Sequence, residues 1–232
     1  MGAQLTRRET SRQTTRRDIL DAARRLLAAG GPPAVSLRAV AGEIGMTAPG
    51  LYRYFPTHEE LLLALTDMVM GEMDDVLEYA RDGDGPAEPD ARMAAVARTF
   101  RHWCVGHPHE FQLMFGLTVV PEGVPADHCN TPNCVRFGGI FFGLFVALFR
   151  RDRFPVLDES ALDPDLARQL RAWTHSAGQD APLGLVKVFL DGWVRLYGLV
   201  ALELYGHMRF ALDNVEALFE TQMAEFLGTL RP

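Results

Sequence analysis

The 232-residue sequence has few cysteines and no long apolar segment free of charge. Three cysteines, an odd number, fit a reducing cytoplasm better than a disulfide framework. The longest apolar run, residues 137–149, is shorter than the roughly 20 residues that a membrane-spanning helix needs. The N-terminus is rich in arginine and has no apolar core typical of a secretory signal. We therefore expect a cytoplasmic protein with no membrane contact.

Motifs that carry catalysis are also missing. The sequence contains no glycine-rich phosphate loop, no serine nucleophile elbow and no zinc-protease motif. The adjacent carboxylates Asp74 and Asp75 have no basic or nucleophilic neighbour in the sequence, so we expect them to be solvated on a helix surface. We therefore predict that the protein is not an enzyme and needs no cofactor.

One group of cysteines and histidines resembles a metal-ligand set. Its members are His102, Cys104, His107, His109, His128, Cys129 and Cys134. Thiolate and imidazole suit Zn²⁺ or Cu⁺, and Cys129 with Cys134 could instead form a redox pair. Against both, Cys104 falls on an apolar helix face, where cysteine usually behaves as a small hydrophobe. A metal- or thiol-responsive protein is the alternative interpretation, and we assign no metal site.

Charge is distributed unevenly along the chain. Residues 1–56 carry nine arginines and four acidic residues, which gives +5, and the total of −7 therefore leaves −12 for the remainder. A basic N-terminal module on an acidic body is typical of a DNA-binding domain attached to a domain that does not bind DNA. A solvated charge asymmetry is the alternative.

Residues 36–58 have the pattern of two short helices joined by a tight turn. Ser36 is a good helix N-cap, and Gly45 is suited to the left-handed residue that ends a helix. Thr47 can cap a second helix, with Pro49 tolerated in its first turn. One apolar helical face is formed by Leu37, Val40, Ala41 and Ile44. This pattern predicts a helix-turn-helix, whose second helix fits the DNA major groove.

The amino-acid sequence of this region resembles that of the TetR family of transcriptional regulators. The resemblance rests on Leu51-Tyr52-Arg53-Tyr54-Phe55-Pro56, followed by Thr57-His58-Glu59-Glu60-Leu61-Leu62, with Ile19-Leu20-Asp21-Ala22-Ala23 and Gly30-Gly31 upstream. It spans about residues 15–65. A weaker similarity over residues 193–207 points to the branch with a tryptophan–histidine–glycine-type C-terminal domain, with Tyr197 where that branch often has histidine.

The resemblance implies an all-α fold, with a three-helix DNA-binding head and a larger helical domain that binds ligand and dimerises. We expect a flexible basic arm at 1–14, the helix-turn-helix domain at 15–60 and the effector-binding and dimerisation domain at 61–232. Apolar periodicity predicts a helix that starts at Thr14 or Thr15, and later helices near 57–80, 90–105, 110–117, 134–150, 163–175, 182–205 and 211–230. By resemblance, the last two helices form the interface of a homodimer.

Residues expected to contact DNA lie mostly in the helix-turn-helix. They are Arg16, Arg17, Ser36, Arg38, Thr47, Ala48, Pro49, Gly50, Tyr52, Arg53, Tyr54, Thr57 and His58. Thr47, Tyr52 and Tyr54 are phosphate or base-edge contacts by resemblance. Ala48 and Pro49 offer only apolar contact, and Gly50 permits close approach to DNA. His58 stands where most members of the family have lysine, which weakens one expected phosphate contact.

Aromatic residues of the C-terminal part predict an apolar effector pocket, although most of them also serve as core. The expected ligand-contacting set is Trp103, Phe111, Phe115, Arg136, Phe141, Phe145, Phe189, Trp193 and Tyr197. We therefore expect a repressor that a small apolar effector releases from a pseudo-palindromic double-stranded DNA operator. A dimeric ligand-binding protein without DNA affinity remains an alternative.

Overall fold

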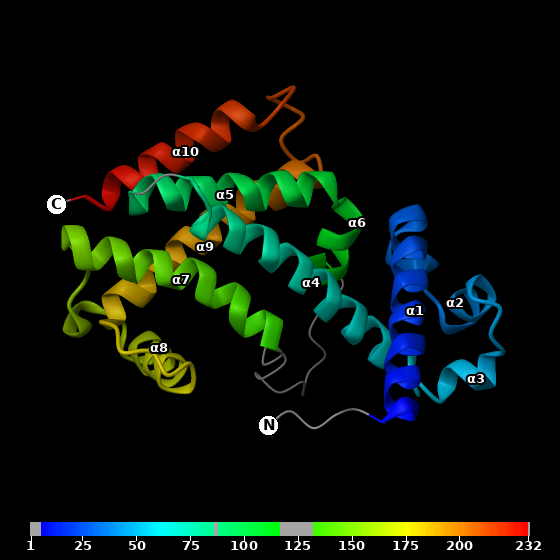
Figure 1. Cartoon of the computed structure of the whole chain (residues 1–232). Helices are drawn as coiled ribbons and strands as arrows, with labels where there is room; N and C mark the ends of the chain where they lie inside the picture. Colours follow the sequence, from blue (N-terminus) through cyan, green and yellow to red (C-terminus); the bar gives the residue numbers. More distant parts are fainter. Residues whose placement is uncertain (1–5, 86–87, 117–131, 232) are drawn as a thin grey trace. The chain divides into compact units, whose positions relative to one another are not determined.

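The structure is a computed structural model that describes residues 6–85, 88–116 and 132–231, without the side chains of residues 132 and 134. It divides into two compact units (Figure 1). Among the described residues, the first unit holds 6–72 and 106–116, and the second unit holds 73–85, 88–105 and 132–231. Each regular element of these residues is helical, as predicted. None of the described helices is long and apolar enough to cross a membrane.

The first unit is built on a three-helix core. Its elements are α1 (Arg7–Gly30), a 3₁₀ helix (Pro32–Ala34), α2 (Leu37–Glu43), α3 (Ala48–Tyr52), the first part of α4 (His58–Asp82), α6 (Pro108–Phe111) and a π-helical turn (Gln112–Gly116). Ile19, Leu27, Leu51 and Phe55 are fully buried, so α1 and α3 contribute to the same core. Residues 108–116, which follow α5 in the sequence, pack with this unit.

α1 starts earlier than its apolar periodicity predicts. The helix begins at Arg7, where Thr6 accepts from the Glu9 backbone N–H and the Glu9 carboxylate accepts from the Thr6 N–H in a capping box. The prediction that Thr14 or Thr15 caps this helix was wrong, and so was the flexible arm over residues 7–14. A threonine followed three residues later by glutamate is a local signal that apolar periodicity does not record. Residues 1–5 of the predicted arm lie outside the described part of the chain.

The turn between α2 and α3 has the predicted chemistry. Gly45 has a φ of +66°, in the left-handed region that favours glycine. The Met46 N–H donates to the Ala41 carbonyl over 2.8 Å, and the Gly45 N–H donates to the Gly42 carbonyl over 3.3 Å. These two bonds form a Schellman motif, which satisfies the last carbonyls of α2 and turns the chain into α3.

The second unit is a bundle with an aromatic interior. It contains the end of α4, α5 (Pro89–Gly106), α7 (Pro132–Asp152), a 3₁₀ helix (Glu159–Ala161), α8 (Pro164–Ser176), α9 (Leu183–Leu204) and α10 (Glu216–Thr229). The Phe100 ring lies 6.0 Å from Phe141 and 5.8 Å from Trp193, centroid to centroid, so α5, α7 and α9 share one core. These helices agree with the predicted ones within a few residues, because the apolar periodicity that predicts them also buries them.

Bidentate ion pairs join α5 to the last two helices. The Arg101 guanidinium donates two 2.7 Å bonds to the Glu203 carboxylate, and only 8% of the Arg101 side chain is exposed. Arg98 donates two 2.6 Å bonds to Glu220 on α10. Both arginines lie on α5, so α9 and α10 are held against one helix by charge as well as by apolar packing.

Asp74 and Asp75 have different environments. Asp75 accepts from Arg136 of α7 over 2.6 Å. Asp74 is fully buried, so the expectation that both carboxylates are solvated was wrong for Asp74. Consecutive residues of a helix point about 100° apart, so Asp74 and Asp75 face different surroundings. Asp74 lies toward the buried side of α4, which also carries Met73 and Leu77.

Candidate functional site

Three hydroxyl side chains cap the N-termini of helices in the first unit. Ser36 caps α2 by accepting from the Ala39 N–H over 3.1 Å, and Thr47 caps α3 by accepting from the Gly50 N–H over 3.3 Å. Thr57 accepts from the Glu60 N–H over 3.1 Å at the start of α4. Each hydroxyl uses an oxygen lone pair in its cap, so its hydrogen is still able to donate to an anion.

The predicted DNA-contacting residues are all at least partly accessible. Ala48, Gly50 and Tyr54 are half-buried and the other members of the set are exposed, with Tyr52 50% exposed. Gly50 also has a local role, because a Cβ there would lie 3.2 Å from Met46 Cγ and 3.2 Å from Thr47 Oγ1. α3 therefore presents Pro49 and Tyr52 to solvent while Leu51 anchors it in the core.

Arg16 holds α1 against the end of α3. Its guanidinium donates to the Tyr54 carbonyl over 3.3 Å and lies 4.2 Å from the centre of the Phe55 ring. The sequence predicts Arg16 only as a solvent- or phosphate-facing residue, because both contacts are made 38 or more positions along the chain. Its main visible role is to position α3, although the side chain is exposed.

His58 bonds to the protein backbone. Its Nε2 lies 2.6 Å from the Val35 carbonyl oxygen, which accepts, so this nitrogen carries a hydrogen. Val35 immediately precedes the cap of α2, and the bond therefore ties the start of α4 to the start of α2. His58 thus links two helix N-termini of the first unit.

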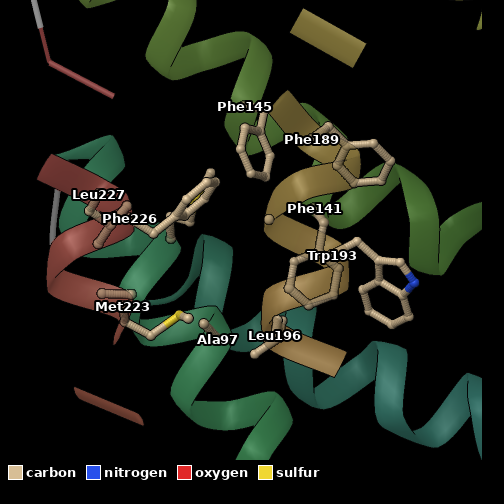
Figure 2. A pocket seen from close by; sticks show the side chains of 12 residues that line it. Ala97, Phe141, Phe145, Phe189, Trp193, Leu196, Met223, Phe226 and Leu227 are labelled. Atoms are coloured by element: carbon tan, nitrogen blue, oxygen red, sulfur yellow. The ribbon is translucent and has the colours of Figure 1, made fainter. Parts of the chain in front are cut away.

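In the second unit, four helices enclose an apolar cavity (Figure 2). Its walls are Met93, Ala94 and Ala97 of α5, Phe141 and Phe145 of α7, Phe189, Gly192, Trp193 and Leu196 of α9, and Met223, Phe226 and Leu227 of α10. In Figure 2 the indole nitrogen of Trp193 points away from the side chains of α10. No charged side chain is among these walls, so the cavity suits an uncharged apolar molecule.

The cavity is small in this state, about 30 Å³. An apolar cavity of about 150 Å³ accommodates benzene, so a ring-sized ligand would have to displace wall side chains. Two of the walls are methionines, Met93 and Met223, which repack more easily than branched or aromatic residues. Gly192 sets the closest approach, because a Cβ there would lie 2.7 Å from Phe145 Cζ and 2.9 Å from Phe226 Cζ.

The cavity brings together only part of the predicted ligand set. Phe141, Phe145, Phe189 and Trp193 line it, whereas Trp103, Phe111, Phe115, Arg136 and Tyr197 do not. Phe111 and Phe115 belong to the first unit, where their rings lie 5.1 Å apart. Arg136 donates to the Glu78 and Asp75 carboxylates of α4, which raises its pKa and occupies its guanidinium. Met223 and Phe226 of α10 also line the cavity, although the expected ligand set contains no residue of this helix. Only the fold identifies them as cavity walls.

The cysteine and histidine group does not form a metal centre in the described residues, which contain no cluster of three or more potential ligands. Cys104 is fully buried, and burial raises the pKa of its thiol well above the usual range, which disfavours the thiolate. His109 Nδ1 donates to the Ala28 carbonyl near the end of α1. His128, Cys129 and the side chain of Cys134 lie outside the described residues.

α9 exposes an apolar stripe along one face. Leu190, Val194, Leu202 and Tyr205 are between 37% and 69% exposed and follow each other at helical spacing. Gly198 lies within this stripe, and a Cβ there would meet no described atom within 4 Å. An apolar stripe with a small residue at its middle permits a second helix to approach closely.

Comparisons with known proteins identify the family of both parts of the chain. Residues 19–65 match the model of bacterial regulatory proteins of the tetR family, and residues 93–226 match the model of the tetracyclin repressor-like C-terminal domain. The HTH-type transcriptional regulators Rv1816 of Mycobacterium tuberculosis and Mb1846 of Mycobacterium bovis are each 28% identical over 202 residues, which covers 86% of this chain and 85% of each relative.

Solved structures share the fold over nearly the whole chain. The regulatory-protein candidate SCO4313 has a TM-score of 0.71 at 27% identity and covers 96% of this chain and 100% of its own. A TetR variant of Acinetobacter baumannii, solved with minocycline, has a TM-score of 0.54 at 14% identity, with 92% of this chain and 90% of its own covered. Because its C-terminal family model alone spans more than half of the sequence, and the helix-turn-helix model lies before it, this chain belongs to the TetR family of transcriptional regulators.

Proposed function

We propose that the protein is a homodimeric repressor that binds a pseudo-palindromic operator through α3 and releases it when a small apolar effector enters the cavity of the second unit. We assign DNA contact to residues 15–60, and effector binding and dimerisation to residues 61–232. Release follows if the effector binds more tightly to the conformation that does not fit the operator.

The observation that carries the proposal is the exposed C-terminal end of α3, where Tyr52 and Arg53 face solvent. Its first turn is fixed by the Thr47 cap and its last turn by Arg16, so Tyr52 and Arg53 are presented on a held helix. Ala48 and Pro49 supply no hydrogen bonds to base edges, so we expect sequence selectivity to depend partly on DNA shape and half-site spacing.

The α9 stripe supports dimerisation through the last two helices. Val194 is the most exposed residue of this stripe, at 69%, whereas α9 buries its opposite face in the second unit. We expect Val194→Glu to lower the mass measured by sedimentation equilibrium toward that of the monomer. Val135→Glu, at a 60% exposed valine of α7, is the matched control and should leave the mass unchanged.

The cavity supports an uncharged apolar effector. Burial of about 100 Å² of apolar ligand surface contributes roughly 2.5 kcal/mol, and the cavity offers a charged ligand no partner. Since α10 supplies one wall and is assigned to the dimer interface, an effector that enlarges the cavity would act directly on the element that sets the separation of the two heads.

Selection of binding sites from random double-stranded DNA, followed by fluorescence-polarisation titration of the selected operator, tests the proposal. We expect selective binding that Tyr52→Ala weakens at least tenfold. Tyr79→Ala, at a 78% exposed tyrosine of α4, is the matched control and should bind as the unmodified protein does. Failure to select any sequence would favour a dimeric ligand-binding protein without DNA affinity and would contradict the proposal.

A further inference from the structure

A second surface of the first unit has the character of an anion site. The first two turns of α1 and the residues that follow α3 border an open cleft of about 670 Å³. Its lining residues are Arg7, Arg8, Ser11 and Arg12 of α1, with Arg53 and Tyr54 after α3. We call this surface the basic cleft. It exists because α1 begins at Arg7, so three arginines expected in a flexible arm are carried on a helix.

The two walls of the basic cleft are held together. Arg8, Arg12 and Arg16 follow each other at intervals of four residues and therefore lie along one line of α1. Arg16, at the end of that line, donates to the Tyr54 carbonyl and lies over the Phe55 ring. The contact that positions α3 thus also holds together the two backbone segments that carry the arginines of the cleft.

The arginines of the cleft have no carboxylate partner in the described part of the chain. Arg7, Arg8, Arg12 and Arg53 are exposed and form no ion pair with any described residue. Glu9 is the one acidic residue among the first 17. Its carboxylate accepts from the Thr6 hydroxyl and N–H, which lowers the pKa of Glu9 and keeps its charge in the helix cap.

This arrangement is unfavourable in the isolated protein. Like charges four residues apart on a helix repel, and cations near a helix N-terminus oppose the helix dipole. A local electrostatic conflict without an internal partner is expected where a ligand relieves it. The ligand must be anionic, and it must have several anionic groups to neutralise four guanidinium groups along one cleft.

We propose that the basic cleft binds consecutive backbone phosphates of double-stranded DNA beside the groove that α3 enters. In this proposal Arg7, Arg8 and Arg12 supply affinity that does not depend on sequence, and Arg53 belongs to both surfaces. A planar guanidinium is suited to bidentate bonding of phosphate oxygens. The inference rests on the proposed DNA-binding function and adds contacts from α1 that lie outside the helix-turn-helix.

The variant Arg7→Gln/Arg8→Gln/Arg12→Gln tests the cleft, because glutamine keeps the helix propensity of arginine. The matched control is Arg168→Gln/Arg171→Gln/Arg209→Gln, which removes the same charge from exposed positions of the second unit. The plot of log Kobs against log salt should become less steep by about 0.9 for each phosphate that the variant no longer neutralises, up to about 2.7 per head. The ratio of operator to random-DNA affinity should change by less than about threefold, because phosphate contacts carry no sequence information.

Operators with single uncharged methylphosphonate linkages locate the contacts. Removing the charge of a phosphate bound by the cleft should weaken the unmodified protein and the control several-fold, and should have little effect on the triple variant. Arg12→Gln alone, which leaves the Thr6–Glu9 cap intact, should lower the slope by about 0.9 and covers the case in which the triple variant unfolds the start of α1. Circular dichroism measures that helix content directly.

Two failures are distinguishable. If the unmodified protein binds the selected operator but the triple and single variants keep the slope of the control, or if each methylphosphonate weakens the triple variant as much as the control, the basic cleft is not a phosphate site. If the unmodified protein selects no DNA at all, the proposed function and this inference are both wrong.

Discussion

Most arginines of the second unit form ion pairs with described carboxylates, whereas most arginines of the first unit do not. Lys187 is the one lysine among 23 basic residues, so the contrast does not come from residue type. In the second unit, Arg98, Arg101, Arg136 and Arg151 each form an ion pair with at least one carboxylate. In the first unit, the arginines at 7, 8, 12, 17, 38 and 53 form no ion pair with any described residue.

This difference separates arginines that stabilise the fold from arginines whose charge is available to a binding partner. A paired arginine has its charge balanced within the fold, and substitution of that arginine leaves a carboxylate without its ion-pair partner. An unpaired, exposed arginine contributes little to stability, but it retains its charge for a partner. The first unit also contains the exceptions Arg24, which pairs with Glu72, and Arg25, which pairs with Glu43. Both lie in the last two turns of α1, away from the exposed start that carries the basic cleft.

The largest expected effect comes from removing a paired arginine of the second unit, which should lower the stability of the fold. Arg101→Met leaves Glu203, whose side chain is 17% exposed, without its two hydrogen bonds. We expect a loss of about 3 kcal/mol in the free energy of unfolding, measured by urea denaturation followed by circular dichroism. Replacing both partners, as Arg101→Met/Glu203→Leu, should recover most of it. If the single variant is as stable as Arg17→Gln in the first unit, the structural role of the pair is wrong.

A smaller effect is expected for the apolar interior of the second unit. Gly192→Ala places a Cβ against Phe145 and Phe226, and overpacking of this kind typically costs about 1–3 kcal/mol. We also expect loss of the response to an apolar effector, measured as operator release, with operator affinity retained. Gly143→Ala on α7 is the matched control, because its Cβ would meet no described atom within 4 Å. An unchanged effector response in Gly192→Ala would exclude this cavity as the effector site.

The smallest effect concerns pH. The hydrogen bonds from Arg98 hold the pKa of Glu220 below its ordinary value of about 4.5. A lowered folded-state pKa contributes stability that is present above the ordinary value and is lost as pH falls through the folded-state value. Because both side chains are at least 40% exposed, solvent screening limits the contribution to less than about 1 kcal/mol. Melting temperatures of the unmodified protein and Arg98→Gln should therefore differ slightly at pH 7, and the difference should shrink as the pH falls below about 4.5.

Local signals made most of the fold predictable. Ser36, Gly45, Thr47 and Thr57 act within a few residues of themselves, and each has the predicted capping or turn role. The start of α1 was also predictable, because the Thr6–Glu9 capping box is visible in the sequence. The prediction missed this start because it relied on the periodicity of apolar residues, which does not extend over residues 7–14.

Contacts between distant segments were not predictable. Arg136 pairs with carboxylates about 60 positions away, and a single sequence gives no reason to prefer these over a ligand. The cavity depends on which faces of α5, α7, α9 and α10 meet, so Met223 and Phe226 were indistinguishable from other core residues. The basic cleft likewise requires α1 and the end of α3 to lie together, which follows from the contacts of Arg16.

The salt dependence of operator affinity tests the contrast between the units most directly. Affinity for the selected operator would be measured by fluorescence polarisation at several salt concentrations for the unmodified protein, Arg53→Gln and Arg98→Gln. A steep negative slope of log Kobs against log salt is expected for the unmodified protein. Arg53→Gln should reduce the slope by about 0.9 per head, and Arg98→Gln should leave it unchanged. A flat slope for the unmodified protein, or equal slopes for all three, would contradict the assignment of the unpaired arginines to DNA.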